Sequence, residues 1–226
     1  MKKQLLFLIT FFYLVPITYC LAQDTRLWAT YYGGTGYEYG GSTTTDASGN
    51  VYLSGVTSSS SGIATTAAFQ TTFGGGPYDA FLVKFDANGT RLWATYYGGT
   101  GYESIGMTTI DASGNVYLVG FTNSISGIAS GGFQTTYGGG TYDAFLVKFD
   151  ANGNRLWATY YGGTGDDSGS DIVIDASGNV YLSGRTNSSS GIATAGAFQT
   201  ALSGSYDVFL VKFDANGNRL WATYYG

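Results

Sequence analysis

Acidic residues beside tyrosines recur along this chain of 226 residues and are its first candidates for chemistry. They follow a repeated GGTG motif, and the set consists of Tyr37, Glu38, Tyr39, Tyr102, Glu103, Asp166 and Asp167. Carboxylates next to tyrosines suit the hydroxyl groups of a sugar, or a cation. The alternative is that one acid per repeat caps a loop or pairs with Arg or Lys. Paired carboxylates such as Asp166 and Asp167, without a third partner, are a weak basis for acid–base catalysis.

Two shorter acidic motifs also recur three times each. DASGN begins at Asp46, Asp111 and Asp175, and DANG begins at Asp86, Asp150 and Asp214. Aspartate and asparagine oxygens are calcium ligands, but the complete calcium-loop pattern with a final Glu is absent. The same side chains accept hydrogen bonds from the backbone of a tight turn. We therefore predict turns at these motifs rather than metal sites.

Aromatic and basic residues recur with the same period. The recurring tryptophans are Trp28, Trp93, Trp157 and Trp221, and the recurring lysines are Lys84, Lys148 and Lys212. The tryptophans, each followed by a Tyr pair, are compatible with a carbohydrate-stacking ladder. Their identity from copy to copy favours packing inside the fold instead. Each lysine lies in an apolar segment, so we expect it to pair with a carboxylate or to extend outward.

These residues belong to a tandem repeat. The sequence RLWATYYG begins at Arg26, Arg91, Arg155 and Arg219, with spacings of 65, 64 and 64 residues. A fixed period of this kind indicates one structural unit copied along the chain. We divide residues 23–226 into copies at 26–90, 91–154 and 155–218, with a partial copy at 219–226.

Each copy predicts four strands. In the third copy they are expected at 171–175, 180–183, 207–213 and 219–225, with DASGN and DANG as hairpin turns. No segment after the N-terminal leader shows a sustained helical period, so essentially no helix is expected there. The strands are apolar on both faces, which suits a sheet packed between two neighbours. Four antiparallel strands per copy are typical of a β-propeller blade.

The order of motifs in each copy resembles a known family. GGTG with an acidic residue precedes DASGNVYLSG, followed by AFQTTxGGG and YDAFLVKF. This order is similar to the bacterial β-propeller repeat called SBBP, over nearly the whole chain after the leader. The resemblance implies a propeller fold and an exported bacterial protein, and it carries no established reaction. The chain departs from the pattern at Pro77 and at Ser203–Ser205, which replace parts of two glycine tracts.

The number of strands predicts an incomplete ring. The chain contains three full blades and one surplus outer strand, either Arg26–Tyr32 or Arg219–Tyr225. Three blades are fewer than the roughly four to eight that close a propeller. We favour a fragment of a longer propeller. The alternative is self-association through blade faces that no further repeat covers.

The N-terminus is expected to be an export signal. Lys2 and Lys3 precede an apolar run, and small residues around Leu21 predict cleavage after Ala22. Cys20 would anchor a lipoprotein, but the large Tyr19 before it argues against lipidation. The run is too short for a membrane span. We therefore predict a signal peptide at 1–22 and a secreted or cell-surface protein.

Composition limits the function further. The chain has no His, and its single Cys lies in the leader, which removes disulfides and the commonest general base and zinc ligand. Cleavage of the leader with its two lysines changes the net charge from −5 to −7. An acidic surface disfavours nucleic acid and anionic membranes as partners. We expect no cofactor.

Positions that differ between copies are the best candidates for specialised roles. On the innermost strand the first copy offers Thr43 and Thr44 where the third has only apolar residues, so we expect the polar part of any central site there. We predict a non-catalytic binding or structural module with a glycan or a surface protein as ligand. The alternatives are a carbohydrate-active lyase or hydrolase and a calcium-dependent adhesin.

Overall fold

The computed structural model describes residues 27–226, and the predicted leader at 1–22 lies outside them. The described residues contain twelve strands and no helix. The strands are β1 (Glu38–Thr45), β2 (Val51–Thr57), β3 (Asp79–Phe85), β4 (Arg91–Tyr97), β5 (Glu103–Ile110), β6 (Val116–Thr122), β7 (Asp143–Phe149), β8 (Arg155–Tyr161), β9 (Asp167–Ile174), β10 (Val180–Thr186), β11 (Asp207–Phe213) and β12 (Arg219–Tyr225). The innermost strand of each copy begins at the recurring acid, a few residues earlier than expected in the third copy.

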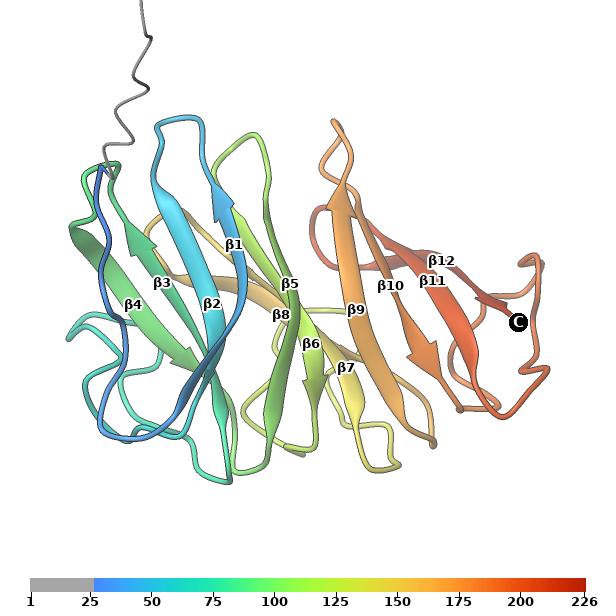
Figure 1. Cartoon of the computed structure of the whole chain (residues 1–226). Coiled ribbons are helices and arrows are strands. Elements are labelled where there is room, and N and C mark those ends of the chain that lie inside the picture. The colour runs from blue at the N-terminus through green and yellow to red at the C-terminus, as the bar shows by residue number, and fades with distance from the viewer. Residues whose placement is uncertain (1–26) are drawn as a thin grey trace, which may run out of the picture.

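The strands form three separate antiparallel sheets of four, each in sequence order. We call them blade 1 (β1 to β4), blade 2 (β5 to β8) and blade 3 (β9 to β12). Their first strands β1, β5 and β9 are neighbours, and the sheets fan outward from them, as Figure 1 shows. The predicted all-β architecture with propeller-type blades is therefore confirmed. The three blades do not close a ring.

The DASGN and DANG motifs form the predicted hairpin turns. In the first copy, the Asp46 and Asn50 backbones pair, and Gly49 has a φ of +77°, which favours glycine. The Oδ1 atom of Asp46 accepts hydrogen bonds from the backbone N–H groups of Ser48 and Asn50, at 2.9 and 3.0 Å. The turn's own backbone and side chains thus occupy this carboxylate, as the turn interpretation requires.

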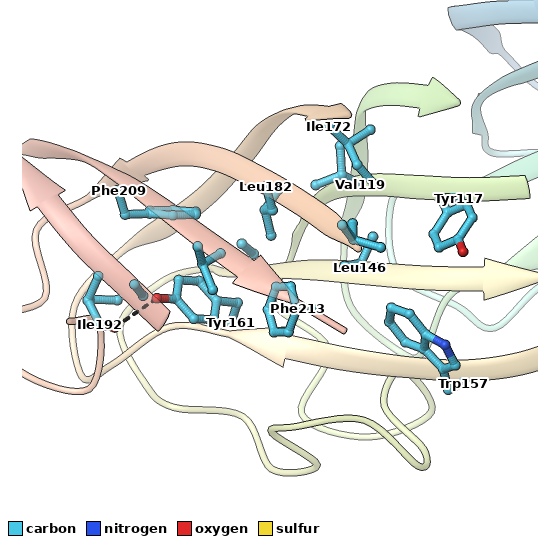
Figure 2. Packing of buried hydrophobic residues seen from close by; sticks show 14 of the residues in the cluster. Tyr117, Val119, Leu146, Trp157, Tyr161, Ile172, Leu182, Ile192, Phe209 and Phe213 are labelled. Atoms are coloured by element: carbon cyan, nitrogen blue, oxygen red, sulfur yellow. Dashed lines mark hydrogen bonds between the residues drawn. The ribbon is translucent and has the colours of Figure 1, made fainter. Parts of the chain in front are cut away.

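Neighbouring blades meet through a repeated aromatic contact. Tyr161 of β8 packs between Phe209 and Phe213 of blade 3, with ring centroids 5.0 and 5.8 Å away. Its hydroxyl donates a hydrogen bond to the Ile192 carbonyl at 2.8 Å, drawn as a dashed line in Figure 2. Trp157 donates from Nε1 to the carbonyl of Ala215 at 3.1 Å. The recurring Trp and Tyr thus pack one blade on the next.

The same contact joins blade 1 to blade 2 and fixes the recurring lysines nearby. Tyr97 lies 5.4 Å from Phe145 and donates to the Ile128 carbonyl at 2.9 Å. The lysines pair with carboxylates as expected: Lys84 with Asp46 at 3.7 Å, Lys148 with Asp111 at 3.9 Å, and Lys212 with Asp175 at 3.7 Å. Each ammonium also lies about 5 Å from a tyrosine ring of its own blade.

The prediction of a thirteenth strand is wrong for the described residues. Arg219–Tyr225 is β12 of blade 3, whereas residues 27–32 form no strand. A strand needs a partner along its edge, and no strand among residues 27–226 pairs with this segment. They still pack on blade 1 as β4 packs on blade 2. Trp28 donates from Nε1 to the Ala87 carbonyl at 3.1 Å, and Tyr32 donates to the Ile63 carbonyl at 2.8 Å.

Candidate functional site

The fan has two faces at opposite ends of its strands. The loop face carries the segments that lead into β1, β5 and β9, together with the long loops after β2, β6 and β10. The turn face carries the DASGN and DANG hairpins. On the loop face the two kinds of segment are joined directly, because the backbone N–H of Tyr102 donates to Asn123 Oδ1 at 2.6 Å. Gly101 N donates to Ser124 Oγ at 2.8 Å in the same way.

The recurring acids lie beneath this face and bind their own loops. Glu103 and Asp167 are completely buried, and Glu38 is half-buried. Glu103 Oε1 accepts hydrogen bonds from Thr122 Oγ1 and Ser124 Oγ, both at 2.6 Å. The structure therefore separates these three acids, predicted as ligand-binding, from the exposed tyrosines that precede or follow them.

A row of aromatic side chains crosses the surface of the loop face from blade 1 to blade 2. Each ring contacts the next with centroids 4.9 to 6.2 Å apart, mostly edge to face. We call this set the aromatic row, and it consists of Tyr39, Tyr78, Tyr102, Phe121 and Tyr142. Tyr39 is 57% exposed and the others are half-buried, so the row presents ring surface to solvent. Tyr37 is exposed beside it.

A shallow pocket of about 260 Å³ lies along the row between blades 1 and 2. Tyr39 and Tyr78 of blade 1 line it together with Tyr102, Ser104 and Ile105 of blade 2. Rings with exposed edges and faces supply apolar area, and their hydroxyl groups supply hydrogen bonds. Such a pocket suits the side chain of a partner better than a small charged metabolite.

The equivalent position between blades 2 and 3 is charged. Asp166 stands where blade 2 has Tyr102, and Arg185 stands where blade 2 has Phe121. Arg185 lies over the ring of Tyr206 at 4.5 Å, and the Tyr206 hydroxyl contacts Asp166 Oδ2 at 3.5 Å. A hydrogen bond from the backbone N–H of Thr141 lowers the pKa of Asp166, which therefore stays ionised.

A second pocket of about 150 Å³ joins the two halves of the loop face. Phe121 and Tyr142 of the aromatic row line it together with Asp166 and Arg185. The loop face therefore changes from aromatic to charged along a continuous path. We call Asp166, Arg185 and Tyr206 the charged cluster.

The turn face holds larger but polar hollows. One of about 530 Å³ lies between the DASGN turns of blades 1 and 2, and it includes Thr44 and Lys84. Burial raises the pKa of Asp46 there, but hydrogen bonds from Asn50 and Ser48 outweigh it, so the pKa is lowered and the group is ionised. Thr44 thus lies at the opposite end of β1 from the aromatic row, and Thr43 is exposed on the same strand without lining either loop-face pocket. The structure does not bring these hydroxyls together with the loop-face residues.

Sequence reasoning singled out Tyr37, Tyr39, Tyr102 and Asp166 but missed the other members of the loop face. The sequence did contain one signal. The three copies have different residue types at one equivalent position, which is occupied by Val56, Phe121 and Arg185. The partner tyrosines are identical in all three copies: Tyr78, Tyr142 and Tyr206. Their repetition made them look like blade-building residues.

Comparison with known proteins agrees with this architecture. Residues 156–191 match the SBBP family of beta-propeller repeats, which confirms the resemblance over that segment. The chain is 30% identical over 171 residues to an uncharacterized WD repeat-containing protein of Acanthamoeba polyphaga mimivirus. That match covers 64% of this chain and 12% of the viral protein.

A second relative is the regulatory protein FlaEY of Caulobacter vibrioides, which is 26% identical over 179 residues. The match covers 77% of this chain and 18% of that protein. The chain thus spans less than a fifth of the length of either relative. Both names are those of repeat or regulatory proteins and not of enzymes, which accords with a repeat module used for binding or structure.

Two further observations concern alternatives raised by the sequence. Among residues 27–226 there is no helix long and apolar enough to cross a membrane. The same residues contain no group of three or more acidic, histidine or cysteine side chains placed to hold a metal.

Proposed function

We propose that this protein is a non-catalytic binding module whose loop face recognises another protein. The main support is the location of the residues that differ between the three copies. Blade-packing residues such as Trp93 and Trp157 repeat unchanged, while Tyr102 and Phe121 are replaced by Asp166 and Arg185 on the loop face. Catalysis needs unlike groups brought together, and the recurring acids Glu103 and Asp167 are buried with one oxygen each held by their own loops.

The chemistry of the face favours a protein segment as partner. The aromatic row offers apolar contact area, and the charged cluster next to it offers an arginine and an ionised carboxylate. Aromatic residues and arginine are the side chains that dominate protein interfaces. A partner with an apolar side chain followed by charged or amide groups would fit this order. The names of the relatives add support, since one is a WD repeat-containing protein and the other a regulatory protein.

The test is a selection of displayed random peptides on the purified protein, with a glycan array run in parallel. We expect peptides to be enriched, and Phe121→Ala and Arg185→Ala each to weaken the best of them by about tenfold. Leu92→Ala is the matched control, because Leu92 is half exposed on β4 and outside the loop face. Saturable glycan binding lost in Tyr39→Ala, without peptide enrichment, would replace the protein partner by a glycan.

We also propose that the protein acts outside the cell, at the cell surface or secreted. The support is the basic, apolar and small-residue pattern of residues 1–22. Expression in a bacterial host followed by mass measurement of the exported protein tests this. We expect a mature N-terminus at Gln23. Retention of the uncleaved chain in the cytoplasm would contradict export.

A second proposal is self-association through the open face of blade 3. Trp221 and Tyr225 are exposed there, whereas their counterparts Trp157 and Tyr161 are buried by a following blade. On a second copy the matching carbonyls of blade 1 already accept hydrogen bonds, Ala87 from Trp28 and Ile63 from Tyr32. Head-to-tail pairing therefore requires displacement of residues 27–32.

Light scattering coupled to size-exclusion chromatography tests this proposal. We expect a concentration-dependent mass above that of one chain, enhanced by deletion of residues 23–32 and abolished by Trp221→Ala. A constant monomer mass in the deleted protein would contradict self-association.

A further inference from the structure

Two pairs of acidic side chains lie inside the junctions between blades, under the loop face. Asp79 begins β3 and meets Glu103, which begins β5 of the next blade. Asp143 of β7 meets Asp167 of β9 in the same way. All four side chains belong to residues with 0% exposure. Burial of this kind is costly for a carboxylate that has no compensating partner.

Each carboxylate of the first pair has one satisfied oxygen and one orphaned oxygen. Asp79 Oδ2 accepts hydrogen bonds from Gly74 N at 2.6 Å and Gln70 Nε2 at 3.2 Å. The loop hydroxyls of Thr122 and Ser124 hold the Oε1 atom of Glu103. Asp79 Oδ1 and Glu103 Oε2 are buried and have no hydrogen-bond partner.

The second pair repeats this arrangement. Asp143 Oδ2 accepts from Gly138 N at 2.6 Å, and Asp167 Oδ2 accepts from Ser188 Oγ at 2.7 Å. Asp143 Oδ1 and Asp167 Oδ1 are the orphaned atoms. A buried acceptor without a partner costs about 1–3 kcal/mol, and more when it is charged. The same arrangement of orphaned oxygens recurs at both junctions.

The two members of each pair lie against a single glycine. A Cβ atom on Gly98 would lie 2.8 Å from Asp79 Oδ1 and closer still to Glu103 Oε2. A Cβ atom on Gly162 would lie 2.9 Å from the orphaned Asp143 Oδ1 and 2.6 Å from Asp167 Oδ2, which is the hydrogen-bonded oxygen of that carboxylate. The paired carboxylates therefore face the same small space, from which any other side chain is excluded.

Basic side chains do not neutralise these pairs. The ion pairs that lysines form within residues 27–226 join the DASGN carboxylates of the turn face, at the other end of the strands. Burial raises the pKa of all four acids, and the hydrogen bonds to their satisfied oxygens oppose this shift only in part. One proton would neutralise only one member of a pair, whereas a divalent cation would neutralise both.

We propose that each junction binds one divalent cation, with calcium as the preferred ion, between the carboxylates of Asp79 and Glu103 and between those of Asp143 and Asp167. The donors are all oxygens, which selects Ca²⁺ over ions that prefer nitrogen or sulfur. With two carboxylates per site, backbone oxygens and water supply the remaining ligands. Each ion would bridge two blades and so strengthen their junction.

The pairs also bind protons. Burial, with a smaller contribution from the negative charge of Glu103, raises the pKa of Asp79 to about 7. Burial and the charge of Asp167 likewise raise the pKa of Asp143 to about 7. Protons therefore compete with the ion, whose affinity falls as the pH drops below about 7 and levels off above that value.

The ends of the fan provide an internal control. Asp207 of β11 is the third copy of the same aspartate, but no following blade brings it a second carboxylate. Its Oδ1 atom accepts hydrogen bonds from Ser203 Oγ and Gly204 N, at 3.3 and 3.2 Å, and is not orphaned. The structure therefore assigns two ions to residues 27–226 rather than three.

The test is calorimetric titration of the chelator-treated protein with CaCl₂ at pH 8. We expect about two ions bound per chain and a rise in Tm of several degrees at saturation. Asp79→Asn and Asp143→Asn should each remove one ion, and Asp207→Asn should remove none. Asp207 is the matched control, because it accepts the same kind of hydrogen bond from Gln199 as Asp79 accepts from Gln70.

Terbium luminescence of the wild-type protein tests ion binding without any variant, so it applies even if a variant fails to fold. Tyr97 and Tyr160 lie within electrostatic reach of Glu103 and would sensitise Tb³⁺ emission. We expect emission that Ca²⁺ quenches by displacement. Absence of both heat and emission would overturn the proposal, as would binding that Asp207→Asn removes equally. If both Asn variants are more stable than wild type in chelator and Ca²⁺ has no effect, each pair holds a proton and not an ion.

Discussion

The junction between blades 2 and 3 and the open face of blade 3 contain the same residues in different surroundings. Trp157 is 6% exposed and Tyr161 is fully buried, whereas Trp221 is 38% exposed and Tyr225 is 66% exposed. Both pairs lie in the identical segment RLWATYY, on β8 and β12. The contribution of this segment to the free energy of unfolding therefore depends on whether a neighbouring blade packs against it. In a repeat fold, interface terms between neighbours carry much of the stability.

The largest expected effect distinguishes these two tyrosines. Tyr161→Ala removes a ring held between Phe209 and Phe213 and a hydroxyl bonded to Ile192, so we expect a loss of about 3–5 kcal/mol. Tyr225→Ala should cost less than about 1 kcal/mol, because its ring is exposed. Denaturant unfolding of both variants measures the difference. Equal losses would show that blade 3 is covered in solution.

A smaller effect is expected from filling the space between the paired acids. Gly162→Ala places a methyl group against the carboxylates of Asp143 and Asp167 and should cost about 1–3 kcal/mol. Gly40→Ala is the control, since a Cβ atom there meets nothing within 4 Å. Thermal unfolding would show the contrast. A neutral Gly162→Ala variant would mean that the carboxylates move apart easily and do not form a fixed pair.

The acid pairs also predict an unusual dependence of stability on pH. In chelator, the folded-state pKa of Asp79 and Asp143 is about 7, well above the usual value for Asp. The folded state then holds more protons than the unfolded state between about pH 4 and 7, so stability falls as the pH rises through this range. We expect Tm to be higher at pH 5 than at pH 8.

Variants and calcium sharpen this prediction. Replacing both aspartates by Asn should flatten the profile between pH 5 and 8, and saturating Ca²⁺ should flatten it in the wild type. Asp207→Asn should leave the slope unchanged. A wild-type Tm that rises steadily from pH 5 to pH 8 in chelator would contradict a raised pKa at the junctions.

Much of the fold was predictable because it is repeated. The period of RLWATYYG, the DASGN and DANG turns and the apolar strands predicted twelve of the strands and their grouping into blades. Packing of Trp93 and Trp157 and pairing of Lys84 followed from their identity in every copy. The thirteenth strand at residues 27–32 was wrong, because a strand needs a neighbour that the local sequence does not encode.

The candidate site was less predictable, because it forms between copies. Tyr39 and Tyr102 were found from their place beside an acid, but the contact of Tyr102 with Tyr78 depends on how blades 1 and 2 are placed. The pairing of Asp79 with Glu103 is a contact of the same kind, between motifs that the sequence treats as separate. The spacing of residues within one copy predicts neither of these two contacts, because each joins the start of an innermost strand to the preceding blade.

The smallest expected effect concerns residues 27–32, which pack on blade 1 without belonging to a sheet. Trp28 makes the same hydrogen bond to Ala87 that Trp157 makes to Ala215, but its segment has no strand partner and is free to leave with little cost. We expect Trp28→Ala to cost about 1 kcal/mol and Trp157→Ala about 3–5 kcal/mol. Hydrogen exchange should show residues 27–32 exchanging through local opening while β8 exchanges only on global unfolding. Equal protection of the two segments would mean that a tryptophan and a tyrosine anchor the chain as firmly as a complete sheet does.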